Sequence, residues 1–290
     1  MHSVERMRPM LGTFVTIQAT GADHVAPACI QSAIDSAFRA ISRVDELMSA
    51  HRYRSDIGRL NRSRPGASVL VHRWTYQVLA QAQALWRCSG GAFDCNVGRS
   101  LIKAGLLPRR RGTAAPYAPH TPSFSPFGST VTLRPHRRVG VAQSLSLDLG
   151  GIAKGFAIDQ AVQALQARRM ISGVVNAGGD LRTFGNAAQP IWRRCINEPG
   201  AAEPIGHLQN GAIATSAPYF THHRQRLKCA VSAVSAIVNP KTKIFCALPE
   251  SISVVAPTGM LADALTKIAA IRGKLPRRLA RYGSAWMVAT

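Results

Sequence analysis

Residues 148–159 read DLGGIAKGFAID, and this stretch joins a turn to the start of a helix. The Gly150-Gly151 pair predicts the turn, because glycine adopts positive φ at no steric cost. Apolar residues at helical spacing follow, and they predict a helix over Ala153–Arg169. Amides at the start of such a helix can face an anion. The stretch has neither the order of a Walker A loop nor that of a GxGxxG fingerprint, so it predicts no P-loop and no dinucleotide fold.

Outward from this helix, the chain alternates between helical and extended patterns. Apolar stripes predict helices at Ala26–Met48, Arg73–Cys88 and Met260–Ile271. Ser49–Asn61 is expected to be a polar connection. Strands are predicted at Leu11–Ala19, Val131–Leu133, Arg138–Val141, Val174–Asn176, Ile191–Ile196, Ala212–Thr215, Val234–Val238, Ile252–Val255 and Ser284–Val288.

The order of these elements favours an α+β fold. They follow no strict βαβ rhythm and show no internal repeat. We therefore expect one domain over residues 1–290, with mixed sheets flanked by helices. Residues 108–128 are rich in proline and arginine, and they predict a long insertion loop.

The charge of the chain is strongly positive. Lysine and arginine number 36 against 14 acidic residues, which gives a formal net charge of +22. Such a surface attracts polyanions, so nucleic-acid binding is a competing function. The basic residues are spread along the chain rather than concentrated in one helix, which speaks against specific nucleic-acid recognition. An anionic small ligand such as a nucleotide would also be attracted by this charge. No apolar run could span a membrane, and Met1–Pro9 has no signal-peptide core, so we expect a cytoplasmic protein without a membrane partner.

Four short clusters place an aspartate beside glycine or alanine. They are GGAFD at 90–94, DLGGIAKG at 148–155, NAGGD at 176–180 and ADALT at 262–266. Glycine lets backbone amides approach a phosphate or a ring closely. The carboxylate can bind a ribose or an isoalloxazine, or hold Mg²⁺. Each cluster alone is most simply a turn, but together they hold four of the 14 acidic residues.

The order of these clusters and of several shorter motifs resembles the ApbE family. The family-like motifs are LGT at 11–13, SAHRYRSDIGRLN at 49–61, GAFD at 91–94, DLGGIAKGFAID at 148–159, NAGGD at 176–180, WRRCINEP at 192–199, ATS at 214–216 and ADAL at 262–265. Each motif is a modest signal, whereas eight of them in the family's order are specific.

The resemblance implies a flavin-handling enzyme. Members of the family bind FAD and Mg²⁺, and many transfer FMN to a Ser or Thr hydroxyl of an acceptor protein and release AMP. Position by position, the resemblance implies Asp263 and Lys154 as catalytic residues, and Gly151, through its carbonyl, and Asp263 as metal ligands. It implies FAD contacts at Leu11, His51, Ala92, Phe93, Asp94, Asp148, Lys154 and Ile237.

The chain departs from the family pattern near its C-terminal end. The segment SAIVNPKTK at 235–243 has Ala236 where the family has His, Asn239 where it has Asp, and Lys243 where it has Gly. Alanine cannot take a proton from an incoming hydroxyl. Lys267 replaces a Thr one helical turn after Asp263, and its ammonium could pair with that carboxylate where a cation would stand. The alternative function is therefore a catalytically impaired FAD-binding or FAD-hydrolysing relative.

Overall fold

Seven strands form one sheet in which each neighbouring pair is antiparallel. The computed structural model describes residues 1–108, 125–186, 188–194, 202–217, 234–248, 251–282 and 284–288. In spatial order, the strands of this sheet are β1 (His2–Met10), β2 (Thr13–Gly21), β6 (Ser172–Ala177), β7 (Asp180–Phe184), β10 (Ala212–Ser216), β13 (Ser251–Ala256) and β14 (Ser284–Val288).

Smaller sheets and helices complete the described part of the chain. The smaller sheets are β3 (Ser68–Leu70) with β5 (Arg138–Val141) and β4 (Val131–Arg134), β8 (Gln189–Arg194) with β9 (Ala202–Leu208), and β11 (Val234–Val238) with β12 (Phe245–Ala247). The helices are α1 (Pro27–Met48), α2 (Asp56–Leu60), α3 (Arg73–Cys88), α4 (Gly98–Lys103), α5 (Phe127–Thr130), α6 (Ala153–Ala167), α7 (Gly259–Arg272) and a 3₁₀ helix at Arg277–Tyr282. The predicted α+β class is confirmed.

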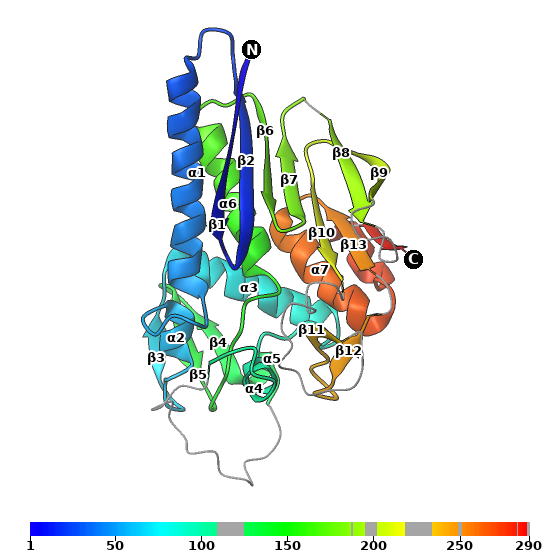
Figure 1. Ribbon diagram of the computed structural model, residues 1–290. Coiled ribbons are helices and arrows are strands. Elements are labelled where there is room, and N and C mark those ends of the chain that lie inside the picture. Colours follow the sequence, from blue (N-terminus) through cyan, green and yellow to red (C-terminus); the bar gives the residue numbers. More distant parts are fainter. Residues whose placement is uncertain are drawn as a thin grey trace.

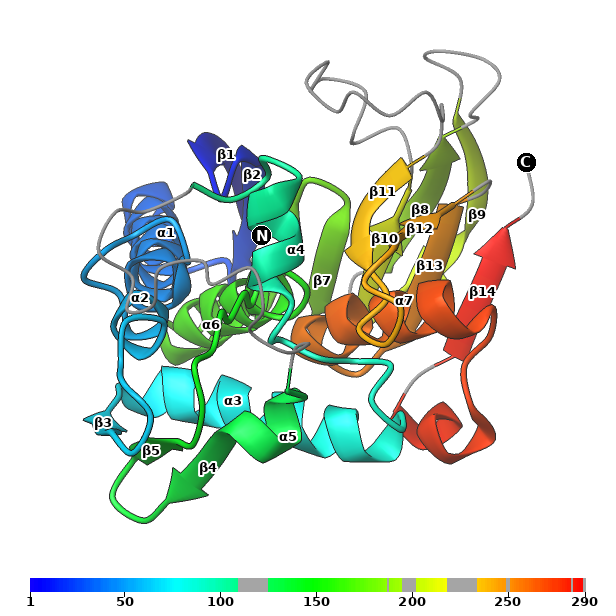
Figure 2. The same cartoon turned by 90° about the horizontal axis from the view of Figure 1, so that it is seen from below.

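Three long helices cover one face of the large sheet. Figures 1 and 2 show α1, α6 and α7 in one layer against the strands, with α3 on the far side of that layer. Contacts join α1 to β2, α6 to β6 and β7, and α7 to β10 and β13. The four predicted helices correspond to α1, α3, α6 and α7; the bounds of α3 agree at both ends, and the ends of the others differ by at most two residues.

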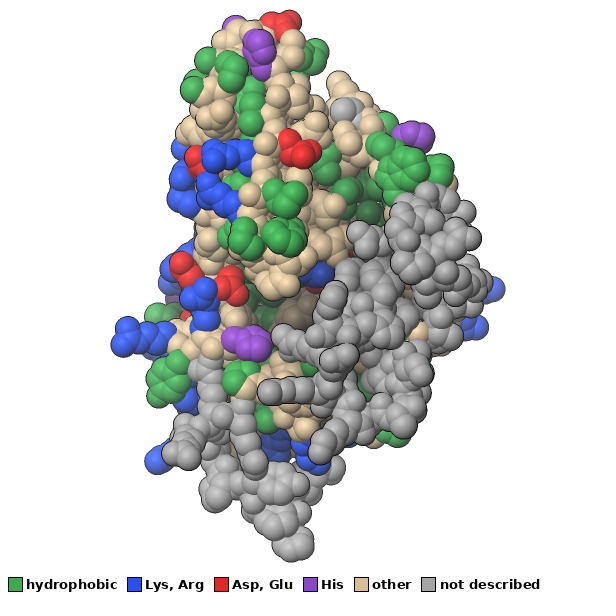
Figure 3. All heavy atoms as spheres, viewed as in Figure 1, with side chains coloured by type: hydrophobic (Ala, Val, Ile, Leu, Met, Phe, Trp, Pro, Cys, Tyr) green, Lys and Arg blue, Asp and Glu red, His purple; other side chains and the backbone are tan. Residues whose placement is uncertain are grey.

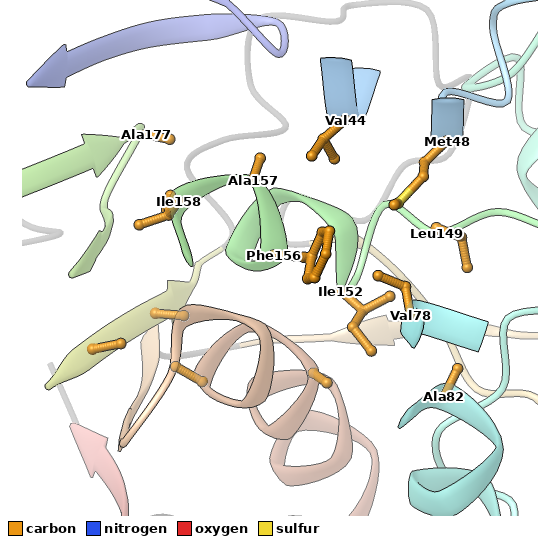
Figure 4. Packing of buried hydrophobic residues seen from close by; sticks show 14 of the residues in the cluster. Val44, Met48, Val78, Ala82, Leu149, Ile152, Phe156, Ala157, Ile158 and Ala177 are labelled. Atoms are coloured by element: carbon orange, nitrogen blue, oxygen red, sulfur yellow. The ribbon is translucent and has the colours of Figure 1, made fainter. Parts of the chain in front are cut away.

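Helix α6 is enclosed on all sides in its first half. Every residue from Gly155 to Val162 is buried, because the sheet lies on one side and α3 on the other. Figure 4 shows Ile152 and Phe156 beside Val78 of α3, and the Phe156 ring makes an edge contact with Trp74 of the same helix. A helix that is buried on every side belongs in a core, and the buried residues of α6, which include Asp159 and Gln160, extend beyond the predicted apolar stripe.

Helices α6 and α7 cross at two glycines. A Cβ on Gly155 would lie 2.0 Å from the carbonyl oxygen of Gly259, so only glycine allows this approach. Asp159 accepts hydrogen bonds from the amides of Gly259 (2.7 Å) and Met260 (2.9 Å), at the start of α7. The amide of Gly155 donates to Asp263 at 3.1 Å. These contacts fix the starts of both helices side by side.

Strand β1 is an element that the sequence pattern did not predict. It lies at the edge of the sheet and most of its side chains are exposed, so no apolar alternation marks it. Arg8 and Pro9 are typical of an edge strand, where charge and a missing N–H block further pairing. Arg8 also pairs with Asp35 of α1 at 2.6 Å.

Other predictions meet the structure in part. The connection at Ser49–Asn61 contains the short helix α2, and residues 109–124 of the predicted insertion lie outside the described residues, as do Cys195 and Ile196 of a predicted strand. The predicted first strand begins at Thr13, because Leu11 and Gly12 form a turn. Within the described ranges, no helix is long and apolar enough to cross a membrane.

Candidate functional site

A cavity of about 540 Å³ opens at one end of the large sheet, between the β1–β2 turn, the start of α6 and strand β11. On the face drawn in Figure 3, the surface is hollowed just below the tip of the β1–β2 hairpin. All eight residues predicted to contact FAD line this cavity, namely Leu11, His51, Ala92, Phe93, Asp94, Asp148, Lys154 and Ile237. Gly151 lines it as well, whereas Asp263 does not reach it.

A second hollow of about 630 Å³ lies at the same hairpin. Residues 9–14 line it together with Ser42, Asp45, Glu46 and Arg52. Leu11 is the one predicted contact residue among its described lining residues. The predicted residues therefore converge on the first cavity.

The rim of the first cavity contains a strained turn. Leu11 has a φ of 54° and Gly12 a φ of 73°, and Met10 pairs with Thr13 across the hairpin. Two central residues with positive φ are the pattern of a type I′ turn, which prefers Asn or Gly at both positions. Leucine at such a φ is uncommon, and strain of this kind gathers at functional sites. The turn presents the Leu11 side chain at the cavity edge.

Asp94 holds the opposite wall in place. Its carboxylate accepts hydrogen bonds from the amides of Asn96 (2.7 Å) and Phe127 (3.0 Å). Burial raises the pKa of Asp94, and these two hydrogen bonds oppose the rise. The Ser89 hydroxyl accepts from the backbone amide of Phe93 at 2.9 Å, which fixes the backbone of that loop beside the cavity. Both carboxylate oxygens of Asp94 are thus engaged with the backbone.

Asp148 is positioned by a residue whose role the sequence did not reveal. The Asn61 side chain accepts from the amide of Leu147 (2.6 Å) and donates to its carbonyl (2.9 Å), so it fixes the residue before Asp148. The amide of Gly150 donates to Oδ2 of Asp148 at 3.1 Å. Burial raises the pKa of Asp148 above its ordinary value. Asn61 ends a motif that was recognisable, but the 86-residue separation hid its partner.

Lys154 forms an ion pair with a carboxylate that the motif left without a role. Its ammonium lies 3.0 Å from Oδ2 of Asp180, a side chain only 2% exposed. Burial raises the pKa of Asp180, with Asp263 adding to the rise. Burial acts to lower the pKa of Lys154, but the carboxylates of Asp180 and Asp263 raise it above the ordinary value, so the ammonium is charged at neutral pH.

Asp263 lies behind Lys267 rather than in the cavity wall. The Asp263 side chain is fully buried, and its Oδ1 lies 2.5 Å from Nζ of Lys267, which does line the cavity. Its Oδ2 accepts from the amide of Gly155. The stem of Lys267 passes Gly151 so closely that a Cβ there would lie 3.3 Å from its Cγ. The ammonium also donates to the Thr266 hydroxyl at 3.1 Å.

These residues do not fit a divalent cation. Mg²⁺ demands near-octahedral oxygen ligands at about 2.0–2.1 Å. Here both oxygens of Asp263 are engaged, one by an ammonium that would repel a second cation. Thr266 donates to the Asp263 carbonyl at 2.7 Å and accepts from Ser216 at 3.0 Å. Across the part of the chain that the structure describes, no group of three or more His, Cys, Asp or Glu side chains could hold a metal.

The remaining departures from the family pattern lie on β11 and in the turn after it. Ala236 is exposed and lines the cavity next to Ile237, so the missing imidazole would have faced the cavity. Asn239 accepts from the amide of Lys241 at 3.0 Å, which an Asp oxygen would do equally well. Lys243 keeps a left-handed φ of 62°, a conformation that favours glycine.

Known proteins resemble this chain over most of its length. The sequence profile of the ApbE family matches residues 11–283. The FAD:protein FMN transferase of Treponema pallidum is 29% identical over 198 residues, which are 64% of this chain and 55% of that protein. Its counterpart in Haemophilus influenzae is 27% identical over 241 residues, 77% of this chain and 67% of that protein. The chain therefore spans about half to two thirds of these two curated relatives.

The fold has a close counterpart among solved structures. The crystal structure of the ApbE protein from Thermotoga maritima superposes with a TM-score of 0.78 at 27% identity, covering 99% of this chain and 94% of that one. The resemblance inferred from eight short motifs is confirmed.

Proposed function

We propose, from the premise that the chain belongs to the ApbE family, that it is a transferase which moves FMN from FAD to an acceptor protein. The acceptor group is a Ser or Thr hydroxyl, and AMP is released. The observation that carries the proposal is the convergence of eight predicted FAD contacts on one cavity, from segments as far apart in sequence as Leu11 and Ile237. Its volume of about 540 Å³ lies within the usual range of small-molecule sites.

The reaction exchanges one phosphorus–oxygen bond for another. The acceptor hydroxyl oxygen attacks the phosphorus of the FMN half, the bond to the bridging oxygen breaks, and AMP leaves with that oxygen. Gly150, Gly151, Lys154 and Lys267 line the cavity around the start of α6, and we call them the cavity floor. There the helix start and the Lys154 ammonium would neutralise the pyrophosphate. Backbone amides and ammonium donors aimed at developing phosphate charge stabilise such a transition state. We assign Lys154 this role, with Asp180 positioning it.

The hydroxyl proton needs an acceptor, which Ala236 cannot be. Titratable side chains that line the described cavity wall are His51, Asp94, Cys95, Asp148, Lys154 and Lys267. The two lysines are engaged as donors, the oxygens of Asp94 hold backbone amides, and burial raises the pKa of the Cys95 thiol well above its ordinary value. We therefore propose Asp148 or His51 as the base. Measuring the transfer rate against pH in Asp148→Asn and in His51→Gln separates these two candidates. The variant that lacks the base loses the fall in rate on the acidic side of the profile.

The test is an incubation of the full chain with FAD and a Ser/Thr acceptor domain. AMP is followed by chromatography and covalent FMN by mass spectrometry. AMP formed together with flavinylated acceptor supports the transferase. Lys154→Met is expected to lower the rate about a hundredfold or more, as the loss of one charge-stabilising donor does, whereas the exposed Lys103→Met should leave it unchanged.

Ala236 gives the second candidate function its support. A relative that binds FAD without a base would hold the cofactor and transfer nothing, or would let water take the place of the hydroxyl. FAD binding without AMP, or AMP without flavinylated acceptor, would replace the transferase by this candidate. The proposed transfer uses no magnesium ion at Gly151 and Asp263, because Lys267 pairs with Asp263 and passes Gly151 closely. The cytoplasmic location stays a prediction.

A further inference from the structure

Lys267 stands between a buried carboxylate and the cavity. Its side chain is 20% exposed and lines the cavity, while Asp263 behind it is fully buried. Any ligand on the cavity floor therefore meets the ammonium and not the carboxylate. The distance of 2.5 Å between Nζ and Oδ1 is that of a close, charge-assisted pair. Gly151 leaves the space that the lysine stem occupies.

The ammonium has the right remaining capacity for an anion. Lysine carries three N–H donors. Within the described residues, Lys267 directs one donor to Asp263 and one to Thr266, which leaves the third for an oxygen in the cavity. Lys154 lines the same cavity with its own buried carboxylate behind it. Two ammonium groups, each held in place by an aspartate, thus face one floor.

We infer that Lys267 is a built-in cation that replaces a divalent metal at this site, so that a diphosphate ester binds between Lys267 and Lys154 without Mg²⁺. Each lysine and its aspartate are electrically neutral together before the ligand arrives. Affinity then rests on directed N–H donors and on the start of α6, rather than on a strong local field. That the diphosphate belongs to FAD rests on the proposed function; the replacement of the metal does not.

The first test uses divalent metal alone. Mn²⁺ binding to the purified full chain is followed by electron paramagnetic resonance in the absence of nucleotide. We expect no stoichiometric Mn²⁺ binding by the wild type. Lys267→Thr frees Asp263 and adds a hydroxyl one turn away, so this variant should gain a Mn²⁺ site. Lys274→Thr, an exposed lysine just beyond the same helix, is the matched control and should gain none.

The second test measures FAD binding by flavin fluorescence in EDTA and in excess Mg²⁺. The wild-type Kd should agree within about twofold between the two conditions. Lys267→Thr should bind FAD at least about tenfold more weakly in EDTA than in Mg²⁺, and Lys267→Arg, which keeps the charge, should stay metal-independent. Circular dichroism confirms that each variant is folded.

The outcomes separate the two proposals. Stoichiometric Mn²⁺ binding by the wild type that Asp263→Asn abolishes would overturn the inference, as would a wild-type Kd that rises tenfold in EDTA. If FAD does not bind under either condition, the proposed function fails, while the Mn²⁺ result still decides whether Lys267 replaces a metal. The wild-type measurements carry this decision even if Lys267→Thr does not fold.

Discussion

Replacing Gly155 by alanine tests the crossing that positions the whole cavity floor. The new Cβ would lie 2.0 Å from the carbonyl oxygen of Gly259 and 2.8 Å from the amide of Met260. Because ordinary carbon–oxygen contacts begin at roughly 3.3 Å, α6 and α7 would have to separate by more than about 1 Å. Overpacking of this kind costs about 1–3 kcal/mol.

The separation would also weaken hydrogen bonds between the helices. They are the bond from Gly155 to Asp263 and those from Gly259 and Met260 to Asp159, each worth about 1 kcal/mol. The better helix propensity of alanine offsets about 1 kcal/mol of this loss in stability. The expected net loss is about 3–5 kcal/mol, a large part of the roughly 5–15 kcal/mol that stabilises a typical domain.

Urea unfolding followed by circular dichroism measures this loss. Gln163→Ala, an exposed change on the same helix, is the control and should shift the free energy of unfolding by less than about 0.5 kcal/mol. A Gly155→Ala variant within about 1 kcal/mol of the wild type would mean that the helices do not approach so closely. The position of Asp263 beside the start of α6 would then lose its physical basis.

Three further predictions concern the cavity wall and the turn after β11. Burial raises the pKa of Asp148 in the folded state, so the contribution of this carboxyl group to stability is full below the ordinary pKa of 3.8 and is lost as pH rises through the folded pKa. At neutral pH, Asp148→Asn should therefore unfold at a higher urea concentration than the wild type. A lower urea midpoint would contradict this. Lys243→Gly should stabilise by about 0.5–1 kcal/mol, because it relieves a φ of 62°, and urea midpoints test it. Ala236→His should leave both the FMN-transfer rate and FAD affinity unchanged within about threefold, because Asp148 or His51 already serves as the base; a roughly hundredfold rise in a stopped-time mass assay would mean that the chain lacks a base.

The long helices could be predicted because their apolar periodicity extends over several turns. This holds for α1 and α3, whose buried residues recur at helical spacing. Helix α6 was found for the same reason, although it is buried on all sides rather than along a stripe. Strand β1 was missed because an exposed edge strand has no apolar face to signal it.

The family resemblance of short motifs predicted which segments line the cavity. Leu11 and Asp94 both lie at the cavity, but the turn at Leu11 was not predicted, because the alternation of apolar and polar residues there indicated a strand. Partners far along the chain were not predictable. Nothing local connects Lys154 with Asp180 or Asn61 with Leu147, since those pairs arise from packing between distant segments.

Two substitutions from the family pattern show why a motif predicts local structure more reliably than it predicts chemistry. Asn239 replaces an aspartate, yet its carbonyl oxygen accepts the amide of Lys241, so the turn loses nothing. Lys267 replaces a hydroxyl residue without altering the helix, because lysine is a good helix former. Its ammonium nevertheless lies directly against Asp263, so the carboxylate is paired with a lysine and is not open to a metal ion from the cavity. The fold is kept in both cases, and only the second substitution changes what the cavity floor can bind.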